Sequence, residues 1–265
     1  MKQVLASVIG TSEVMPGVFF VTLEAPEIAS VAQPGQFLMV RCGEDTLLRR
    51  PLSIHQVSKK TRLALLFKVI GKGTQWLAQR KVGDKLDLLG PLGNGFMIDP
   101  GAKNLLLLAG GIGIAPLGFL AQEALRLGHT VRLLLGAPSA RHLYPMRYLP
   151  TVSELLTATD DGSTGEKGMI TDILPRFILQ PKDQVFACGP LGMYRDMLAK
   201  HSGLLKDKPV QISLEMRMGC GIGICYACTV KTRTGLKQVC KDGPVFNLQD
   251  VVWDEVSQEK FLKLV

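Results

Sequence analysis

Short apolar runs separated by turn-forming residues make up the first hundred residues of the chain. Each run is rich in leucine, β-branched or aromatic residues, as expected of a strand. The runs cover residues 18–23, 36–40, 63–70 and 85–89, and the turns carry Pro16-Gly17, Pro34-Gly35, Gly83-Asp84 and Gly90-Pro91. Many short strands at regular spacing favour a small antiparallel β-barrel, which we predict over residues 1–98.

The pattern changes near residue 103, where one continuous apolar run ends in a glycine-rich turn. Unbroken apolar character is typical of a parallel strand covered on both faces. A helix from about Ala115 to Arg126 and a second apolar strand over 130–136 complete a strand–helix–strand unit. We therefore predict a doubly wound α/β domain that binds a nucleotide over residues 99–210, and a small third domain over residues 211–265.

Composition and charge narrow the function classes. With 46% hydrophobic and 20% charged residues in a chain of 265, the sequence has the composition of a folded protein of two or three domains. Its net charge of +8 comes mainly from residues 1–98, where 12 Lys and Arg stand against 7 Asp and Glu. The sequence contains no nucleic-acid-binding motif, so dinucleotide phosphates or an acidic protein face are the expected partners.

The sequence also predicts a cytoplasmic protein without a membrane segment. The N-terminus has the pattern of a strand and lacks the apolar core and cleavage site of a signal peptide. An uncharged run over residues 105–122 is interrupted by several glycines and by Pro116, which argues against a spanning helix. Cys42 and Cys188 lie far apart in sequence and are expected to be free thiols, as in a reducing compartment.

The other four cysteines have the spacing of iron–sulfur ligands. Cys220, Cys225 and Cys228 form C-x4-C-x2-C, and Cys240 follows after eleven further residues. This is the plant-type pattern for a [2Fe–2S] cluster, in which four thiolates hold two irons. Zinc ligands usually come as two C-x2-C-like pairs, and disulfides are typical of secreted chains, so both alternatives fit less well. The sequence thus predicts a [2Fe–2S] cluster.

Three segments of the first domain have residue types suited to a phosphate or a flavin. The run Arg49-Arg50-Pro51-Leu52-Ser53 carries guanidinium groups that grip diphosphate and a hydroxyl that can bond a flavin ring nitrogen. Gly71–Thr74 opens a short helix, and Gly90–Phe96 is rich in turn residues. We interpret all three as loops. Taken singly, each fits a surface charge or an ordinary turn better than a binding site.

Their order along the chain resembles the FAD-binding barrel of the ferredoxin–NADP reductase superfamily. The resemblance implies FAD as a cofactor, with Arg50 on the diphosphate and Ser53 on the isoalloxazine ring, and with Pro51 and Leu52 in the same motif. It further implies a set of residues that line the flavin or meet its phosphate or ribitol. These are Leu66, Phe67, Lys68, Gly73 and Thr74.

The second domain carries the same resemblance. Gly110, Gly111 and Gly113 leave room for a diphosphate to approach the backbone closely. Pro116 stands where the G-x-G-x-x-G pattern would have its last glycine, and the superfamily has a proline there too. The resemblance places Cys188-Gly189 beside the nicotinamide of NAD, although Cys188 as a buried core residue is the alternative.

Two further positions concern the nucleotide. Asp160 follows the end of a predicted strand, where a doubly wound sheet binds its ligands. Ser139 and Arg141 follow another strand, at the place where the adenosine ribose is distinguished from its 2′-phosphate. Local residues alone therefore leave NADH and NADPH both open.

The segment around the cysteines narrows the resemblance from the superfamily to one family within it. Leu214-Glu-x-Arg-Met-Gly-Cys220, with the cysteines that follow it, and Cys240-Lys-Asp-Gly-Pro-Val-Phe246 are similar to the electron-transfer subunits of NAD-dependent dihydroorotate dehydrogenases. The resemblance covers essentially the whole chain, in the same domain order. It implies an oxidoreductase subunit that passes electrons from an FMN-containing catalytic subunit through the [2Fe–2S] cluster and FAD to NAD+, in pyrimidine synthesis. It also implies a heterotetramer with two copies of each subunit.

Two alternatives remain open from the sequence. One is an FAD/[2Fe–2S] reductase subunit that serves ferredoxin or sulfide, and the other is a redox sensor or zinc-stabilised interaction module without catalysis. The sequence predicts no dihydroorotate site on this chain. It does not define the redox potentials, the partner interface or the role of Cys42.

Overall fold

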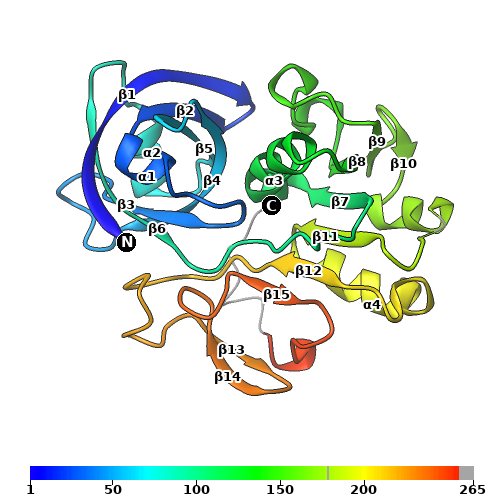
Figure 1. The fold of residues 1–265 in the computed structure, drawn as a ribbon. Coiled ribbons are helices and arrows are strands. Elements are labelled where there is room, and N and C mark those ends of the chain that lie inside the picture. Colours follow the sequence, from blue (N-terminus) through cyan, green and yellow to red (C-terminus); the bar gives the residue numbers. More distant parts are fainter. Residues whose placement is uncertain (178, 257–265) are drawn as a thin grey trace.

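The computed structural model describes residues 1–177 and 179–256, and within them the first part of the chain is a closed antiparallel barrel (Figure 1). Its strands follow the order β1-β2-β5-β4-β3-β6 around the barrel. They are β1 (Lys2–Met15), β2 (Val18–Glu24), β3 (Phe37–Val40), β4 (Arg50–Ser58), β5 (Arg62–Lys68) and β6 (Lys85–Leu92), with the short helices α1 (Pro26–Ala29) and α2 (Lys72–Ala78) between them. The predicted barrel is confirmed.

Two segments that the sequence interpretation assigned to loops lie partly in strands of the barrel, and one of them, Gly90–Leu92, ends β6. The run Arg50–Ser53 was expected to be a loop, but it forms the start of β4, where Pro51 lies opposite Met39 of β3. Proline lacks an N–H donor and is tolerated in a sheet near the beginning of a strand. The two arginines and the proline therefore gave a misleading signal of irregular structure.

The second part of the chain is a sheet with the order β10-β9-β8-β7-β11-β12-β15 in the described residues. The strands are β7 (Asn104–Gly110), β8 (Thr130–Ala137), β9 (Glu154–Thr159), β10 (Glu166–Lys167), β11 (Gln184–Cys188), β12 (Val210–Ser213) and β15 (Val245–Asn247). All neighbours are parallel except β15, which runs antiparallel to β12. The doubly wound prediction is thus confirmed.

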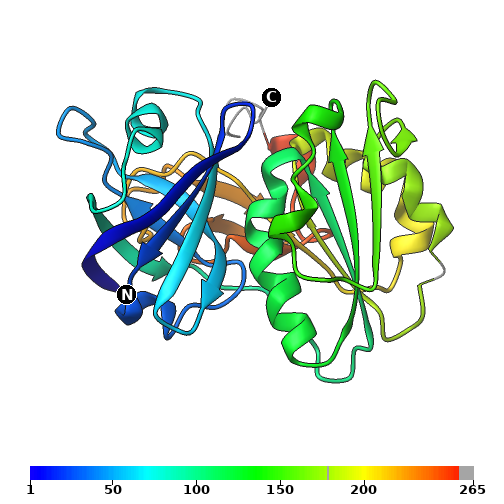
Figure 2. The same cartoon turned by 90° about the horizontal axis from the view of Figure 1, so that it is seen from above.

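Helices cover both faces of this sheet, with α3 (Ile114–Arg126) on the face toward the barrel and α4 (Leu191–Leu205) on the other (Figure 2). The side chains of β7 alternate between the two cores: Leu107 packs in the cluster of α3, and Leu108 in the cluster of α4. Burial on both faces explains the unbroken apolar run in the sequence.

The order of the strands fixes the place of a nucleotide. Strand β7 lies between β8 and β11, so the connections leave it in opposite directions around the sheet. Ligands of doubly wound sheets bind at such a switch point, beyond the carboxyl ends of the strands. Gly110 ends β7 and Cys188 ends β11, which puts both predicted motifs at this crevice.

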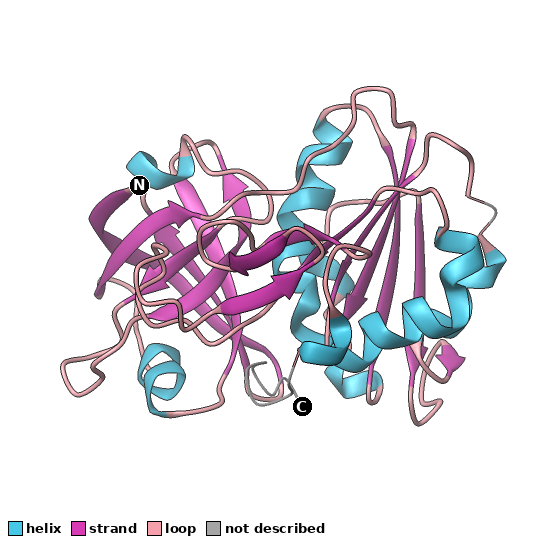
Figure 3. Cartoon of the chain, turned by 90° about the horizontal axis from the view of Figure 1, so that it is seen from below, coloured by secondary structure: helices cyan, strands magenta, loops and turns pink. Residues whose placement is uncertain are grey.

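The last part of the chain is joined to the α/β sheet rather than separate from it. Its hairpin is formed by β13 (Thr229–Thr232) and β14 (Gly235–Gln238). In Figure 1 it lies below the junction of barrel and sheet, and Figure 3 shows the same junction seen from below. Strand β15 returns to the sheet, and Trp253 packs on Tyr194 of α4 with ring centroids 5.2 Å apart. The predicted limit between residues 210 and 211 falls at the first residue of β12, and the domain limits stay predictions.

A buried histidine joins the barrel to the α/β domain. His55 of β4 has Nδ1 2.8 Å from the carbonyl oxygen of Ala115 and Nε2 2.7 Å from the hydroxyl of Tyr144. Burial lowers the pKa of His55 to about 4, although the carbonyls of Ala115 and Ile114 favour the charged form. The ring is therefore neutral near pH 7. It donates from Nδ1 to Ala115 and accepts the Tyr144 hydroxyl proton at Nε2.

No helix within the described ranges is both long and apolar enough to cross a membrane.

We expect Gly118→Ala in α3 to destabilise the protein by about 1–3 kcal/mol, because overpacking would force a fixed ring to move. An added Cβ would lie 2.7 Å from Nδ1 of His55, which two hydrogen bonds hold in place. The matched control is Gly192→Ala in α4, where a Cβ would meet nothing within 4 Å and helix propensity favours alanine. Denaturant unfolding of both variants measures the difference, and equal midpoints would contradict this account of the interface.

Candidate functional site

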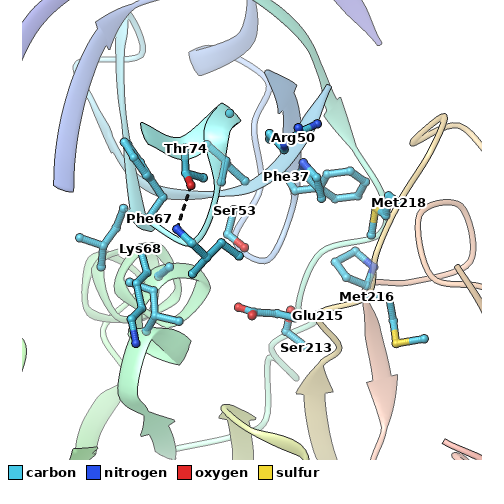
Figure 4. Close-up of a pocket in the computed structure, with 18 of the residues that line it drawn as sticks. Phe37, Arg50, Ser53, Phe67, Lys68, Thr74, Ser213, Glu215, Met216 and Met218 are labelled. Carbon is cyan, nitrogen blue, oxygen red and sulfur yellow. Dashed lines mark hydrogen bonds between the residues drawn. The ribbon is translucent and has the colours of Figure 1, made fainter. Parts of the chain in front are cut away.

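A cavity of about 300 Å³ opens between the barrel, the α/β domain and the segment that follows β12 (Figure 4). Its lining is mostly apolar with a few charged groups, the usual character of a cofactor site. The lining residues are Phe37, Arg50, Pro51, Leu52, Ser53, Leu66, Phe67, Lys68, Ile70, Gly71, Lys72, Gly73, Thr74, Ile112, Ala115, Ser213, Leu214, Glu215, Met216, Met218 and Pro244. All nine residues predicted to bind FAD lie in this set. Their contact with a flavin remains a prediction.

One end of the cavity is suited to a diphosphate. Arg50 packs against the start of α2, because a Cβ on Gly73 would lie 2.6 Å from its Nε atom. Lys72 adds a second cation to the same wall. The Thr74 hydroxyl accepts the N–H of Ile70 at 3.0 Å and donates to the carbonyl of Gly71 at 3.1 Å, so it shapes the loop. A planar guanidinium beside an ammonium fits a diphosphate.

The rest of the cavity is suited to a flat aromatic ring. Leu66 and Phe67 come from β5, Phe37 from β3 and Ile112 from the glycine turn after β7, and together they form apolar walls. Ser53 supplies a hydroxyl at the same wall. This combination fits an isoalloxazine ring, which is apolar on its faces and polar at one edge.

A carboxyl that the sequence interpretation missed points into the cavity. Glu215 follows the end of β12 and extends toward the wall that carries Ser53 and Lys68 (Figure 4). Burial raises its pKa from the usual 4.5 to about 7. A charged residue directly after a sheet strand was the available signal, because the carboxyl ends of such strands face ligands.

The nucleotide crevice adjoins this cavity. A Cβ on Gly113 would lie 2.9 Å from the amide nitrogen of Gly189, and one on Gly110 would lie 3.4 Å from its Cα. The structure therefore brings these glycines together with Cys188, and Gly111 beside them takes φ +56°. Asp160 is exposed at the end of β9, on the far side of β8 from these glycines.

A buried hydroxyl orders the Cys188-Gly189 turn. The Tyr194 oxygen accepts the N–H of Gly189 at 3.0 Å and donates to the carbonyl of Ser213 at 2.9 Å. Burial raises the pKa of the Cys188 thiol well above its usual value, and the nearby Glu215 carboxylate acts in the same direction. Cys188 is therefore a neutral, fully buried thiol, and its Sγ donates to the same Ser213 carbonyl at 3.6 Å.

The four predicted ligand cysteines lie around one loop, and backbone N–H groups point at their sulfurs. Cys220 Sγ accepts N–H groups from Ile222, Ile224 and Cys225 at 3.4, 3.3 and 3.5 Å. Cys240 Sγ accepts the N–H of Gly223 at 3.1 Å. Burial opposes ionisation of Cys220, but these donors outweigh it and lower its pKa to about 6.

The thiols form two neighbouring pairs, Cys220 with Cys225 and Cys228 with Cys240. In the part of the chain that the structure describes, no three His, Cys, Asp or Glu side chains gather around a single metal position. Two pairs suit two irons, each with two protein ligands, better than one zinc with four. The donor set therefore fits a [2Fe–2S] cluster.

One strand of the barrel contacts both the cavity and the cysteine loop. Phe37 of β3 lines the cavity, and a Cβ on Gly221 would lie 2.9 Å from the sulfur of Met39, two residues further along. Gly221 also has φ +75°, a conformation that favours glycine. The cysteine loop is therefore pressed against the barrel beside the cavity.

The fold and the site define a flavin-dependent oxidoreductase of the ferredoxin reductase type with an added iron–sulfur domain. A family model described as the iron–sulfur cluster binding domain of dihydroorotate dehydrogenase B matches residues 215–252. The chain is 44% identical over 262 residues to the electron transfer subunit of dihydroorotate dehydrogenase B (NAD(+)) of Desulforamulus reducens, covering 94% of this chain and 98% of that protein. It is 40% identical to the subunit of the same name from Bacillus caldolyticus, covering 87% and 91%. The chain belongs to this family of electron transfer subunits.

Solved structures of flavin reductases share the fold. An NADH-dependent reduced ferredoxin–NADP oxidoreductase, studied for flavin-based electron bifurcation, has a chain that matches with a TM-score of 0.85 and 32% identity, covering 95% of this chain and 91% of that one. A ferredoxin NADP+ reductase from Neisseria gonorrhoeae with bound FAD and NADP matches with a TM-score of 0.63 and 19% identity, covering 77% and 92%. The second match supports the fold alone.

We expect Glu215→Gln to stabilise the cofactor-free protein at pH 8 by about 1–2 kcal/mol and to have little effect at pH 5. Because the pKa of Glu215 is raised to about 7, the folded state holds its proton more tightly than the unfolded state. That stabilisation is complete below the usual pKa of 4.5 and is lost as the pH rises through 7, and the neutral amide avoids the loss. Denaturant unfolding at both pH values measures this difference in stability.

Glu166→Gln, which removes an exposed ion pair with Arg176, is the control and should give no gain at pH 8. A gain for Glu215→Gln that is equal at both pH values would contradict the assigned pKa.

Proposed function

We propose that this chain is the electron-transfer subunit of an NAD-linked dihydroorotate dehydrogenase and carries electrons from the catalytic subunit to NAD+ in pyrimidine synthesis. The observation that carries the proposal is the contact of three sites around one cavity. The cavity shares Ser213 and Glu215 with the nucleotide crevice, and Met218 and Pro244 with the cysteine loop. The relatives' name, electron transfer subunit, supports this assignment.

Each site on this chain has a distinct task. A bound FAD would supply the exchange between two-electron hydride chemistry and one-electron transfer. Arg50 and Lys72 bind its diphosphate, and the apolar walls exclude water from the reacting ring. The Cys188-Gly189 turn orients the nicotinamide, and the four thiolates hold the two irons. On this proposal the oxidation of dihydroorotate takes place on a partner that carries FMN, in a cytoplasmic assembly with two copies of each subunit.

A second candidate is the same electron transfer in service of ferredoxin or sulfide. The similarity to a chain of a ferredoxin–NADP oxidoreductase at 32% identity favours it. The two functions differ in the electron donor. Co-purification with the native partner, followed by assays of NAD+ reduction with dihydroorotate, reduced ferredoxin or sulfide, separates them. Activity with ferredoxin or sulfide only would overturn the dihydroorotate assignment.

We expect Cys225→Ser to remove the iron from the purified chain and to reduce dihydroorotate-dependent NAD+ reduction by more than 100-fold. Bleaching of the flavin by NADH should stay within about twofold of the wild type, because hydride transfer does not pass through the cluster. The matched control is Cys42→Ala. Cys42 is fully buried among the apolar residues of the barrel, outside the cysteine loop, and burial raises the pKa of its thiol to about 11. Iron analysis and stopped-flow absorbance give both readouts, and loss of flavin reduction in Cys225→Ser would contradict the proposed order.

The cysteine loop also presents the surface that we assign to the partner. Ile224 is 69% exposed and Tyr226 64% exposed, on either side of the exposed Cys225. Apolar side chains that flank a redox centre are suited to a protein interface, where electron transfer needs a short gap. The catalytic subunit would cover them.

We expect Ile224→Asp to weaken co-purification of the catalytic subunit at least tenfold, because the variant buries a carboxylate in an apolar contact. Iron content and flavin reduction by NADH should not change. Leu236→Asp, a similarly exposed position on β14 outside the cysteine loop, is the matched control. Pull-down with the tagged partner measures both. If the two variants weaken binding equally, the interface does not centre on the cysteine loop.

A further inference from the structure

The loop after β6 holds the returning end of the cysteine loop through a single residue. The backbone N–H of Asn94 donates to the carbonyl of Gly243 at 2.6 Å. Its side-chain Nδ2 donates to the carbonyls of Lys241 and Asp242 at 3.3 and 3.0 Å. One residue of the barrel thus binds three successive carbonyls of the other domain.

The segment that Asn94 binds, residues 240–244, connects the two redox sites and is called the stem below. At one end the stem carries the ligand Cys240, whose sulfur accepts the N–H of Gly223 at 3.1 Å. At the other end Pro244 lines the cavity and accepts the N–H of Leu214 at 2.9 Å. A displacement of the stem would therefore move a cluster ligand relative to the cavity.

The contact between barrel and stem is close-packed. A Cβ on Gly93 would lie 2.6 Å from Cδ of Pro244 and 2.7 Å from the carbonyl oxygen of Gly243. Asn94 and Pro244 also form an isolated parallel bridge. Glycine lets the two backbones approach, and Asn94 then supplies the polar contacts that hold them together.

The carboxylate of the stem is already engaged inside its own domain. The carboxylate of Asp242 accepts the N–H of Gln238 at 2.7 Å, which orients the stem from its own side. Both hydrogen bonds from the Asn94 amide therefore go to carbonyl oxygens. An isosteric carboxylate at position 94 would be repelled by the same oxygens.

We propose that Asn94 is a positioning residue for electron transfer, which sets the separation between the cluster and the flavin by fixing the stem against the barrel. The inference rests on the proposed function and adds a specific residue to it. In the cofactor-loaded chain, a reduced flavin would pass one electron to one ferric iron of the cluster, and the rate of this transfer would fall steeply with their separation. Hydride transfer from NADH to the flavin does not use the stem and is independent of Asn94.

The test compares Asn94→Asp, Asn94→Ala and a matched control, Gln56→Ala, in the cofactor-loaded chain. Gln56 also donates an amide N–H to a carbonyl across a domain interface, that of Tyr148 at 2.7 Å, but far along the chain from the stem. After mixing with NADH, stopped-flow absorbance follows the flavin and freeze-quench electron paramagnetic resonance follows the reduced cluster. We expect flavin reduction within twofold of the wild type in all three variants. Cluster reduction should slow at least tenfold in Asn94→Asp and about threefold in Asn94→Ala.

Hydrogen exchange provides a readout that does not depend on activity. Amides of residues 239–243 should exchange at least tenfold faster than in the wild type in both Asn94 variants, and at the wild-type rate in Gln56→Ala. Unchanged exchange in both Asn94 variants, or cluster reduction slowed no more than in Gln56→Ala, would overturn the proposal. If Asn94→Asp loses its iron, its cluster cannot be followed, and the rate of cluster reduction in Asn94→Ala then decides whether the proposal holds. If the wild type itself shows no cluster reduction by NADH, the proposed function fails, and the exchange rates still decide whether Asn94 holds the stem.

Discussion

The pairing of β15 with β12 is the constraint on which the other parts of the molecule depend. The two strands are antiparallel neighbours at the edge of the nucleotide-binding sheet, with Ser213 opposite Val245. Residues 214–244, which connect the two strands and are called the excursion below, leave the sheet and return to it side by side. Glu215 on the outgoing end and Pro244 on the returning end both line the cavity. Since this excursion carries all four predicted ligand cysteines, a cluster bound there could not move away from the cavity unless the edge of the sheet opens.

The surroundings of each cysteine set the pKa of its thiol and therefore the charge that the thiol carries. Cys42 and Cys188 are buried among apolar groups, so burial raises the pKa of each thiol and both stay neutral. Cys220 accepts three backbone N–H groups, and its pKa falls to about 6. Burial and the neighbouring Cys228 instead raise the pKa of Cys240 to about 12, so thiolates crowded around one loop need cations to offset their charge. The protein supplies the donors, and ferric iron would supply the charge.

Features contained in a few neighbouring residues were predictable from the sequence, and features that depend on distant contacts were not. The apolar run before Gly110 and the cysteine spacing each lie within one segment, and the sheet and the thiol pairs agree with them. The strand that begins at Arg50 was missed because Pro51 signals a turn unless its partner strand is known. Glu215 was missed because its burial arises only where the end of β12 meets the barrel. The sequence interpretation missed the pairing of β15 with the α/β sheet, because β15 is only three residues long and its partner β12 lies on the other side of the whole excursion.

A cavity built from three parts of the chain explains why the redox steps have a fixed order. Leu66 comes from the barrel, Ile112 from the α/β domain and Met216 from the excursion, so an aromatic ring between them would contact apolar side chains of all three parts. Binding of the ring therefore also stabilises the contacts between the parts. The Cys188-Gly189 turn adjoins this cavity through Ser213 and Glu215, whereas the cysteine loop adjoins it through Met218 and Pro244. Because the two sites meet different walls, electrons that pass between the cluster and the nucleotide would have to cross the group that the cavity holds.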